Sequence, residues 1–399
     1  MLKRFLAVMF LFVLAVSVYA QSIPSGTGRY SALGNSPFIL DAHIDMLNNP
    51  AWNNNYRNYA FADLSPFDGN DFTGHAGVTF GIGKKWNLGM IVNRVSDSWS
   101  LLDTTPASTP VVPFMGLIGY TASKEFHLGL APYIRLGGNK SVDDDSAATT
   151  LENTSSSIGG NLGFIYMIKK GWIEGSFLFR MNKFENTGPS FTYENDGGIE
   201  FGAQFRAWIY PSKGSKVAVV PVLGFYTFSY QNMLTSGGVT VNGNKNTWLN
   251  IDGGVGLNWP IMDDIQIAGG IRAHYLTRKS EPDSGNAFEE TNLLAPHYNM
   301  AVETRITDWI TARLGFDRGV QNVKQDYPTI NENTLTEFSY IDQTSPSSTF
   351  SMGAGFHFGR FSIDATVSES WFKHGPNFIS GGDNNDLFGV VSASYNFNK

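Results

Sequence analysis

The chain has 399 residues, of which 42% are hydrophobic, 14% are aromatic and 16% are charged, and its formal net charge is −7. This acidic balance argues against nucleic acid as a partner. The absence of cysteine excludes both a disulfide framework and a lipidated cysteine. The 43 glycines suit strands with one apolar and one polar face, although a soluble β-sandwich has a similar composition.

The first twenty residues have the composition of a secretory signal peptide. Lys3 and Arg4 precede an uninterrupted apolar run over residues 5–18, and Ala20 supplies a small residue at the expected cleavage point. We therefore expect a signal peptide over residues 1–20 and a mature chain that starts at Gln21. A retained membrane anchor is the alternative, but the run is short for a span and no charged stop-transfer cluster follows it.

From residue 56 onward, apolar and polar residues alternate with a period of two. Trp86, Leu88 and Met90, for example, alternate with Asn87 and Gly89. No later stretch is apolar over 18 residues, so a closed barrel is the remaining way to span a membrane. The pattern predicts an all-β fold, a transmembrane antiparallel up-and-down β-barrel of about 14–16 strands, with a tally of sixteen, apolar side chains toward lipid and polar ones toward the lumen.

Short and long connections between the predicted strands alternate along the chain. Short turns are expected near residues 83–86, 124–126, 168–172, 210–216, 259–264, 306–309 and 359–361. Long loops are expected near residues 98–112, 138–156, 183–190, 232–246, 280–293, 318–346 and 372–386. Aromatic residues such as Trp86, Trp172, Trp259 and Trp309 adjoin the short turns, where amphipathic rings would settle at the membrane interface. We expect a Gram-negative type of outer membrane, with the short turns and both termini in the periplasm.

Residues 21–55 do not alternate, and we predict that they form an N-terminal plug segment ahead of a barrel domain over residues 56–399. Apolar residues between 38 and 52 favour packing against another surface, and residues 37–47 are expected to form one or two short helices. The segment ends in Asn49-Pro50-Ala51, directly before the first predicted strand. Proline restricts its predecessor to extended conformations, so this triplet is also compatible with a simple turn.

A glycine-rich start, an acidic stretch and then Asn49-Pro50-Ala51 give the chain a family resemblance. It resembles the FadL-like family of outer-membrane hydrophobic-compound transporters and the related PorV-type barrels. In that family the N-terminal segment is a hatch that plugs the barrel. The resemblance implies passive uptake of hydrophobic or amphipathic small molecules through a plugged lumen. It places ligand contacts at Phe38, Leu40, Asn49, Pro50, Ala51 and Trp52, where the plug meets the barrel wall.

The inward face of the predicted strands carries charges of both signs, which should pair because an unpaired buried charge is costly. The predicted lumen-lining residues are His127, Arg135, Glu174, Arg180, Arg206, Arg272, His274, Glu303, Arg305, Arg313 and Asp364. These positions suit a water-filled pore or the support of a plug, whereas a continuous apolar duct is hard to build from them.

The sequence shows little that predicts catalysis or a cofactor. The seven histidines form no His-Glu-x-x-His pair, and no catalytic residue, metal ligand or cofactor is assigned. Ser368 and Ser370 near His374 are a weak nucleophile pattern, and residues 381–386 are a weak calcium-loop pattern. We predict a plugged transporter that contacts outer-membrane lipid and a hydrophobic small-molecule ligand. The alternatives are a general diffusion porin and a non-transporting scaffold of a secretion complex, whose partner would bind the loop at 318–346.

Overall fold

The computed structural model describes residues 26–64, 74–93, 113–143, 149–283, 287–328, 335–342, 349–367 and 388–397. The signal peptide predicted at residues 1–20, the acidic pattern at 381–386 and the serine and histidine pattern at 368–374 lie outside these described residues. Within the described ranges, no helix combines the length and the apolar character that a membrane crossing requires.

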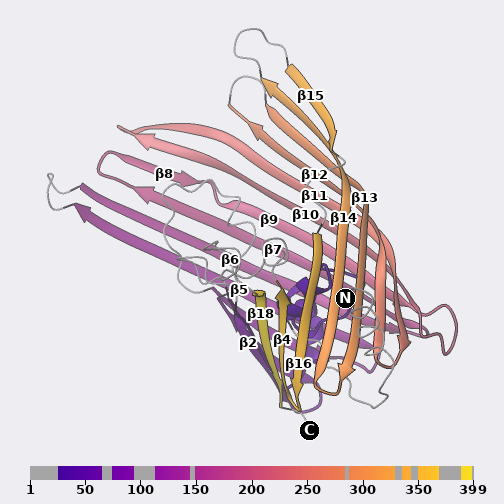
Figure 1. Ribbon diagram of the computed structural model, residues 1–399. Coiled ribbons are helices and arrows are strands. Elements are labelled where there is room, and N and C mark those ends of the chain that lie inside the picture. Colours follow the sequence, from indigo (N-terminus) through magenta and orange to yellow (C-terminus); the bar gives the residue numbers. More distant parts are fainter. Residues whose placement is uncertain are drawn as a thin grey trace, which may run out of the picture.

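Strands make up most of the structure (Figure 1). The first nine are β1 (Tyr59–Leu64), β2 (Ala76–Ile82), β3 (Trp86–Val92), β4 (Phe114–Thr121), β5 (Phe126–Asp143), β6 (Thr149–Ile168), β7 (Gly171–Thr187), β8 (Phe191–Asn195) and β9 (Gly198–Ile209). The others are β10 (Ala218–Ser236), β11 (Val239–Met262), β12 (Ile265–Glu281), β13 (Phe288–Thr307), β14 (Ile310–Pro328), β15 (Leu335–Asp342), β16 (Thr349–Phe358), β17 (Phe361–Val367) and β18 (Phe388–Asn396).

The strands form a closed antiparallel barrel, because β1 pairs with both β2 and β18. The sheet contains 18 strand segments in its described part. Two pairs of segments share one position each: β8 and β9 both pair with β7 and β10, and β15 and β16 both pair with β14. Counted by position, the barrel has sixteen strands, which confirms the predicted tally and the all-β antiparallel fold.

Side chains alternate between the outside and the inside of the barrel wall as predicted. In β3, Asn87 is fully buried, whereas its neighbours Trp86 and Leu88 expose 48% and 40% of their surface on the outer face. Large apolar residues are exposed on most strands, including Phe80, Met90 and Leu162. An apolar exterior around a polar interior is the arrangement of a barrel whose wall contacts lipid.

The aromatic residues beside the short turns do not all face outward. Trp86, Trp259 and Trp309 are exposed, as a membrane-interface position requires. Trp172 is instead half-buried inside the barrel, where it stacks on Trp208 with ring centroids 5.3 Å apart. The sequence expectation was therefore wrong for Trp172, because its strand turns that ring toward the N-terminal segment.

The short turns lie where they were predicted, but several predicted long loops are strand extensions. β10 and β11 continue to Ser236 and Val239, across the loop expected at 232–246, and a two-residue turn of Gly237 and Gly238 joins them. Both glycines have positive φ values, 59° and 80°, which the tight hairpin turn favoured by twisted strands requires. The polar, glycine-containing sequence here resembles a loop, although its backbone is paired on both strands.

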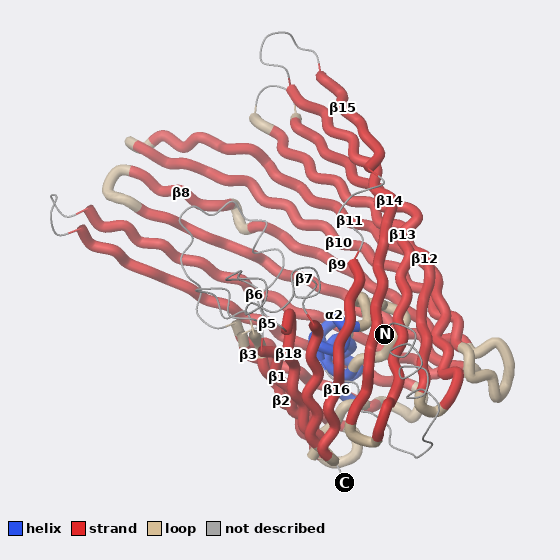
Figure 2. The backbone as a smooth tube through the Cα atoms, viewed as in Figure 1, coloured by secondary structure: helices blue, strands red, loops and turns tan. Residues whose placement is uncertain are grey.

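The N-terminal segment folds inside the barrel, near the end that carries the short turns (Figure 2). It contains α2 (Gly26–Ala32), α3 (Ala42–Asn48) and the 3-10 helix η1 (Pro50–Asn54). Asp41 caps α3 by accepting hydrogen bonds from the backbone N–H groups of His43 and Ile44, and Asn49 caps η1 with Pro50 at its first position. We call residues 26–54 the plug.

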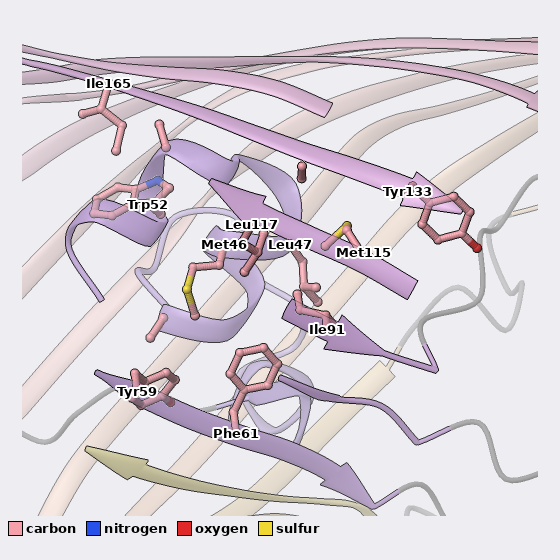
Figure 3. Close-up of a cluster of buried hydrophobic side chains, with 13 residues drawn as sticks. Met46, Leu47, Trp52, Tyr59, Phe61, Ile91, Met115, Leu117, Tyr133 and Ile165 are labelled. Carbon is pink, nitrogen blue, oxygen red and sulfur yellow. The ribbon is translucent and has the colours of Figure 1, made fainter. Parts of the chain in front are cut away.

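Apolar side chains of the plug pack against the inner wall in two clusters. In the first, Met46, Leu47 and Trp52 meet inward-facing residues of the early strands (Figure 3), which include Tyr59, Phe61, Ile91, Met115, Leu117, Tyr133 and Ile165. In the second, Leu33 and Phe38 pack with Trp208. The inner face is therefore apolar in part where it meets the plug, in contrast to the polar face predicted there, because the plug covers these apolar side chains.

Candidate functional site

One buried charge network fastens α2 to the barrel wall. Arg29 donates from Nε to Oε2 of Glu303 at 2.8 Å and from Nη2 to Oε1 at 3.1 Å, and its Nη1 lies 3.1 Å from Asp41 Oδ2. Arg313 Nε also donates to Glu303 Oε2 at 2.6 Å and its Nη1 contacts Asp364. The predicted pairing of opposite charges is confirmed here, and it joins the plug to β13, β14 and β17.

A second network fastens α3 and η1. Arg206 on β9 lies between two carboxylates, with Nη2 2.6 Å from Asp45 Oδ1 and Nε 2.6 Å from Glu174 Oε1. The same guanidinium donates to the backbone oxygen of Ile39 at 3.2 Å. Trp52 Nε1 donates to the other oxygen of Glu174. Charged wall residues therefore supply hydrogen-bond partners to the plug. In return, the plug supplies partners that neutralise or hydrogen-bond part of the buried charge on the wall.

Burial is the largest single influence on the pKa values of the titratable plug residues Arg29, Tyr30 and Asp45. Burial alone would lower the pKa of the Arg29 guanidinium, but the carboxylates of Glu303 and Asp41 outweigh it and raise that pKa. Burial raises the pKa of the Asp45 carboxyl to about 7, against the lowering effect of Arg206. Burial also raises the pKa of the Tyr30 hydroxyl to about 12, so this side chain stays neutral. Such pKa shifts are typical of an interface from which water is excluded. There a charged side chain is stabilised mainly by an oppositely charged neighbour.

Two wall glycines allow the plug backbone to approach closely. A Cβ atom on Gly129 of β5 would lie 2.2 Å from the backbone N of Ala51 and the carbonyl carbon of Pro50. A Cβ atom on Gly315 of β14 would lie 2.1 Å from the backbone N of Gly34. Since real Cβ atoms do not come this close, any larger residue at either position displaces the plug or the strand.

The six residues predicted to contact a ligand lie at the interface of plug and wall. Phe38, Pro50, Ala51 and Trp52 are buried in its packing, and Leu40 is half-buried. Asn49 is different, because it donates to the backbone oxygen of Phe164 at 3.1 Å and also lines a cavity. Ligand contact by these residues stays a prediction.

The predicted lumen residues fall into three groups. The first group contacts the plug or its partners, and its members are Glu174, Arg206, Glu303, Arg313 and Asp364. The second group, Arg272 and His274, lines both cavities. Glu174 and Arg206 of the first group also line the first cavity. The third group lies elsewhere on the wall. Arg180 pairs with Glu200 at 3.4 Å, Arg305 pairs with Asp264 in a short turn at 3.4 Å, Arg135 is buried, and His127 lies 3.3 Å from Thr121 Oγ1.

Two cavities adjoin the plug on the side of β9 to β14. The first, of about 240 Å³, lies between Tyr30, Ile44 and Asp45 of the plug and strands β7 and β9 to β12. The second, of about 460 Å³, is bounded by Gly34 and Asn35 of the plug and by strands β11 to β14 and β16. Both cavities are lined by Arg272 and His274. These two residues therefore stand at the junction of the two spaces.

The lining of the second cavity combines charged groups of both signs with apolar groups. Arg272 Nη2 lies 3.9 Å from Asp317 Oδ2, and His297 Nε2 lies 2.5 Å from Asp317 Oδ1. Leu276 and Leu294 supply apolar surface in the same cavity. A space of this kind can hold a small molecule with one polar end and one apolar end.

A cluster of aromatic side chains, which the sequence analysis did not identify, lies farther along the same inner wall. We call it the aromatic cluster, and it comprises Phe184, Tyr193, Tyr226, Phe228, Tyr230 and Trp248. The Tyr230 and Trp248 rings stack with centroids 5.5 Å apart and 13° between their planes, and the Arg278 guanidinium lies 5.5 Å from the Trp248 centroid. The residues Tyr226, Phe228 and Tyr230 alternate on one face of β10, a signal that was available in the sequence.

Comparison with known proteins gives a structural likeness only. No protein-family model matches the sequence, and no curated protein matches it significantly. Among solved structures, the Pseudomonas putida toluene transporter TodX matches at 9% identity and a TM-score of 0.42, over 94% of this chain and 99% of that one. A Pseudomonas aeruginosa FadL homologue matches at 11% identity and a TM-score of 0.40, over 96% and 100% of the two chains. The chain thus has a structural match, at low sequence identity, to outer-membrane transporters of the FadL and TodX type.

Proposed function

We propose that this protein is an outer-membrane channel for the passive uptake of small amphipathic molecules, and that the plug gates it. The observation that carries the proposal is the pair of cavities between plug and wall that share Arg272 and His274. Because the plug bounds both cavities, a molecule held there is in contact with the element that must move to let it pass.

The proposed path begins at the aromatic cluster and leads to the second and then the first cavity. The half-buried rings of Tyr193 and Tyr226, which pack on the buried rings of the cluster, offer an apolar surface to a ligand that arrives from the end with the long strands. Arg272 then offers a cation whose ion-pair partner within the described residues, Asp317, is 3.9 Å away. A carboxylate or sulfonate on the ligand would approach this guanidinium more closely and bind more strongly than a neutral group.

The proposed orientation in the membrane follows from the apolar exterior of the barrel and from the position of its short turns. The apolar exterior would contact outer-membrane lipid, and the end with the short turns would face the periplasm. The chain enters β1 and leaves β18 at that end, since Phe397 N donates to Asn58 O at 2.8 Å. Both termini of the barrel would then be periplasmic. No catalytic step is part of this function.

The proposal is tested by solute entry into proteoliposomes that contain the full mature chain. The probes are toluenesulfonate, a permanently anionic amphipathic molecule, and glucose, a polar neutral molecule of similar size. We expect toluenesulfonate to enter and glucose to stay outside. Equal entry of both would support a general diffusion porin, and entry of neither would support a scaffold without transport.

The role of the plug is tested by single-channel conductance in planar bilayers. The full mature chain is compared with a chain that lacks residues 21–52. We expect the intact chain to be closed to ions and the truncated chain to conduct, because the packed contacts of the plug fill the lumen near the short turns. Equal conductance of the two chains would contradict gating by the plug.

A further inference from the structure

Three side chains that are separate in the sequence converge where α3 meets the first hairpin of the barrel. His43 comes from α3, Asp63 from β1 and His75 from the residue before β2. The Nε2 atoms of the two histidines are 2.7 Å apart. Asp63 Oδ2 lies 3.4 Å from His43 Nδ1 and 3.4 Å from His75 Nε2. None of the three residues lines either of the two cavities.

The backbone holds these side chains in place. Asp63 and His75 lie opposite each other across the β1–β2 pair, where Asp63 N donates to His75 O at 2.8 Å. His43 is fixed by the Asp41 cap in the first turn of α3, and its ring packs on that of Phe61 with centroids 3.9 Å apart. His43 and Asp63 are buried, whereas His75 is half-buried. The cluster is therefore pre-arranged and still reachable on the His75 side.

Asp63 is placed to bind a cation. Its Oδ1 accepts a hydrogen bond from Thr27 N at 3.2 Å, and its buried Oδ2 has no hydrogen-bond donor within the described residues. That oxygen lies beside Nδ1 of His43 and Nε2 of His75, and the two histidines meet each other through their Nε2 atoms. A buried carboxylate oxygen of this kind is neutralised by a proton of its own, by a protonated imidazole or by a metal ion.

The donor types are those of a zinc site, and Asp63 and His75 also have the spacing of one. Zn²⁺ binds imidazole nitrogen and carboxylate oxygen at about 2.0–2.2 Å, which puts tetrahedral ligands about 3.3–3.5 Å apart. The 3.4 Å between Asp63 Oδ2 and His75 Nε2 already matches this spacing. The Nε2 atoms of the two histidines, at 2.7 Å, would have to separate by less than about 1 Å. The His43 ring would also have to turn, because its Nδ1 rather than its Nε2 now faces Asp63 Oδ2. Three protein ligands leave the fourth position for water.

We propose that His43, Asp63 and His75 bind a divalent transition-metal ion of the zinc type. One ligand belongs to the plug and two belong to the wall, so the ion joins α3 to β1 and β2. Because the three ligands meet only when the plug is docked, binding of the ion stabilises the docked plug. The ligands lie outside both cavities, so the ion would not contact a transported molecule, although by holding the plug docked it would favour the closed channel.

The first test is metal binding by the full mature chain in detergent after removal of metal with a chelator. Zn²⁺ is titrated calorimetrically, and Co²⁺ is followed by its visible ligand-field bands. We expect one equivalent of either ion and a tetrahedral Co²⁺ spectrum. His75→Gln and Asp63→Asn should each weaken binding more than roughly tenfold. His357→Gln, which removes a histidine remote from the cluster, should leave binding unchanged.

The second test measures whether the ion stabilises the docked plug. Zn²⁺ should raise the thermal midpoint of the wild-type chain and of His357→Gln, but not that of His75→Gln. His75 is half-buried, so its glutamine variant should fold even if a variant at the buried His43 does not. No saturable binding by the wild type at about 1 mM Zn²⁺, or equal binding and stabilisation in His75→Gln, would overturn the proposal and leave a hydrogen-bonded triad without metal.

Discussion

Arg29 of the plug and Glu303 of β13 form a two-point ion pair inside the barrel, although 274 residues separate them in the sequence. Their donor–acceptor distances are 2.8 Å and 3.1 Å, and the Arg29 side chain is 4% exposed. A bidentate pair of this kind fixes orientation as well as distance. The docked position of α2 is therefore set by the wall, and the pair is a direct test of docking.

Arg29→Ala should release the plug. The substitution leaves the buried carboxylates of Glu303 and Asp41 without one of their cationic partners, and breaking such a pair costs about 3–5 kcal/mol. We expect more frequent open-channel events in planar bilayers and faster proteolysis of the plug. Lys216→Ala is the control, because the Lys216 pair with Asp263 is on the surface. Unchanged conductance in Arg29→Ala would show that the plug is held mainly by its apolar clusters.

Gly129→Ala should displace η1. The added Cβ atom would overlap the backbone of Pro50 and Ala51, and overpacking of this kind costs about 1–3 kcal/mol. The matched control is Gly138→Ala in the same strand, where the nearest heavy atom to the added Cβ is 3.7 Å away. Proteolysis of the plug in detergent measures the effect. Equal protection in both variants would mean that β5, rather than the plug, gives way.

The barrel could be predicted from the sequence because lipid and lumen impose a two-residue period on every strand. Asn87 between Trp86 and Leu88 shows this rule in one strand. The prediction of a loop at 232–246 was wrong because, beyond the lipid-facing belt, both faces of a strand can be polar. There a paired strand and a loop have the same composition, and only the backbone pairing of β10 and β11 distinguishes them.

The candidate site was predictable only in part. Successive residues of a strand point alternately inward and outward, so Arg206, Arg272 and Glu303 could be assigned to the lumen. Their partners could not, because the position of the plug along the barrel is a tertiary property. The same reason hides the cluster of His43, Asp63 and His75, which becomes visible only when α3 is placed against the first hairpin.

Trp248→Leu should weaken the binding of aromatic solutes. Trp248 is buried, and the change removes the ring on which Tyr230 stacks, a contact worth about 0.5–1.5 kcal/mol. The half-buried rings of the aromatic cluster then lose part of the packing that positions them. Toluenesulfonate affinity, measured calorimetrically in detergent, should fall several-fold. Trp309→Leu is the control, because Trp309 is exposed on the outer face beside a short turn. An equal loss in both variants would indicate that detergent contact, rather than the aromatic cluster, governs the measurement.

Arg272→Gln should remove the preference for an anionic end group. Arg272 lines both cavities, and glutamine keeps polarity there without the positive charge. We expect toluenesulfonate affinity to fall about tenfold, which corresponds to about 1.4 kcal/mol, and its dependence on ionic strength to decrease. Arg360→Gln, in the turn between β16 and β17, is the control for net charge. If Arg272→Gln binds toluenesulfonate as the wild type does, the shared guanidinium is not the recognition element, and the charge of the ligand must be met elsewhere in the lumen.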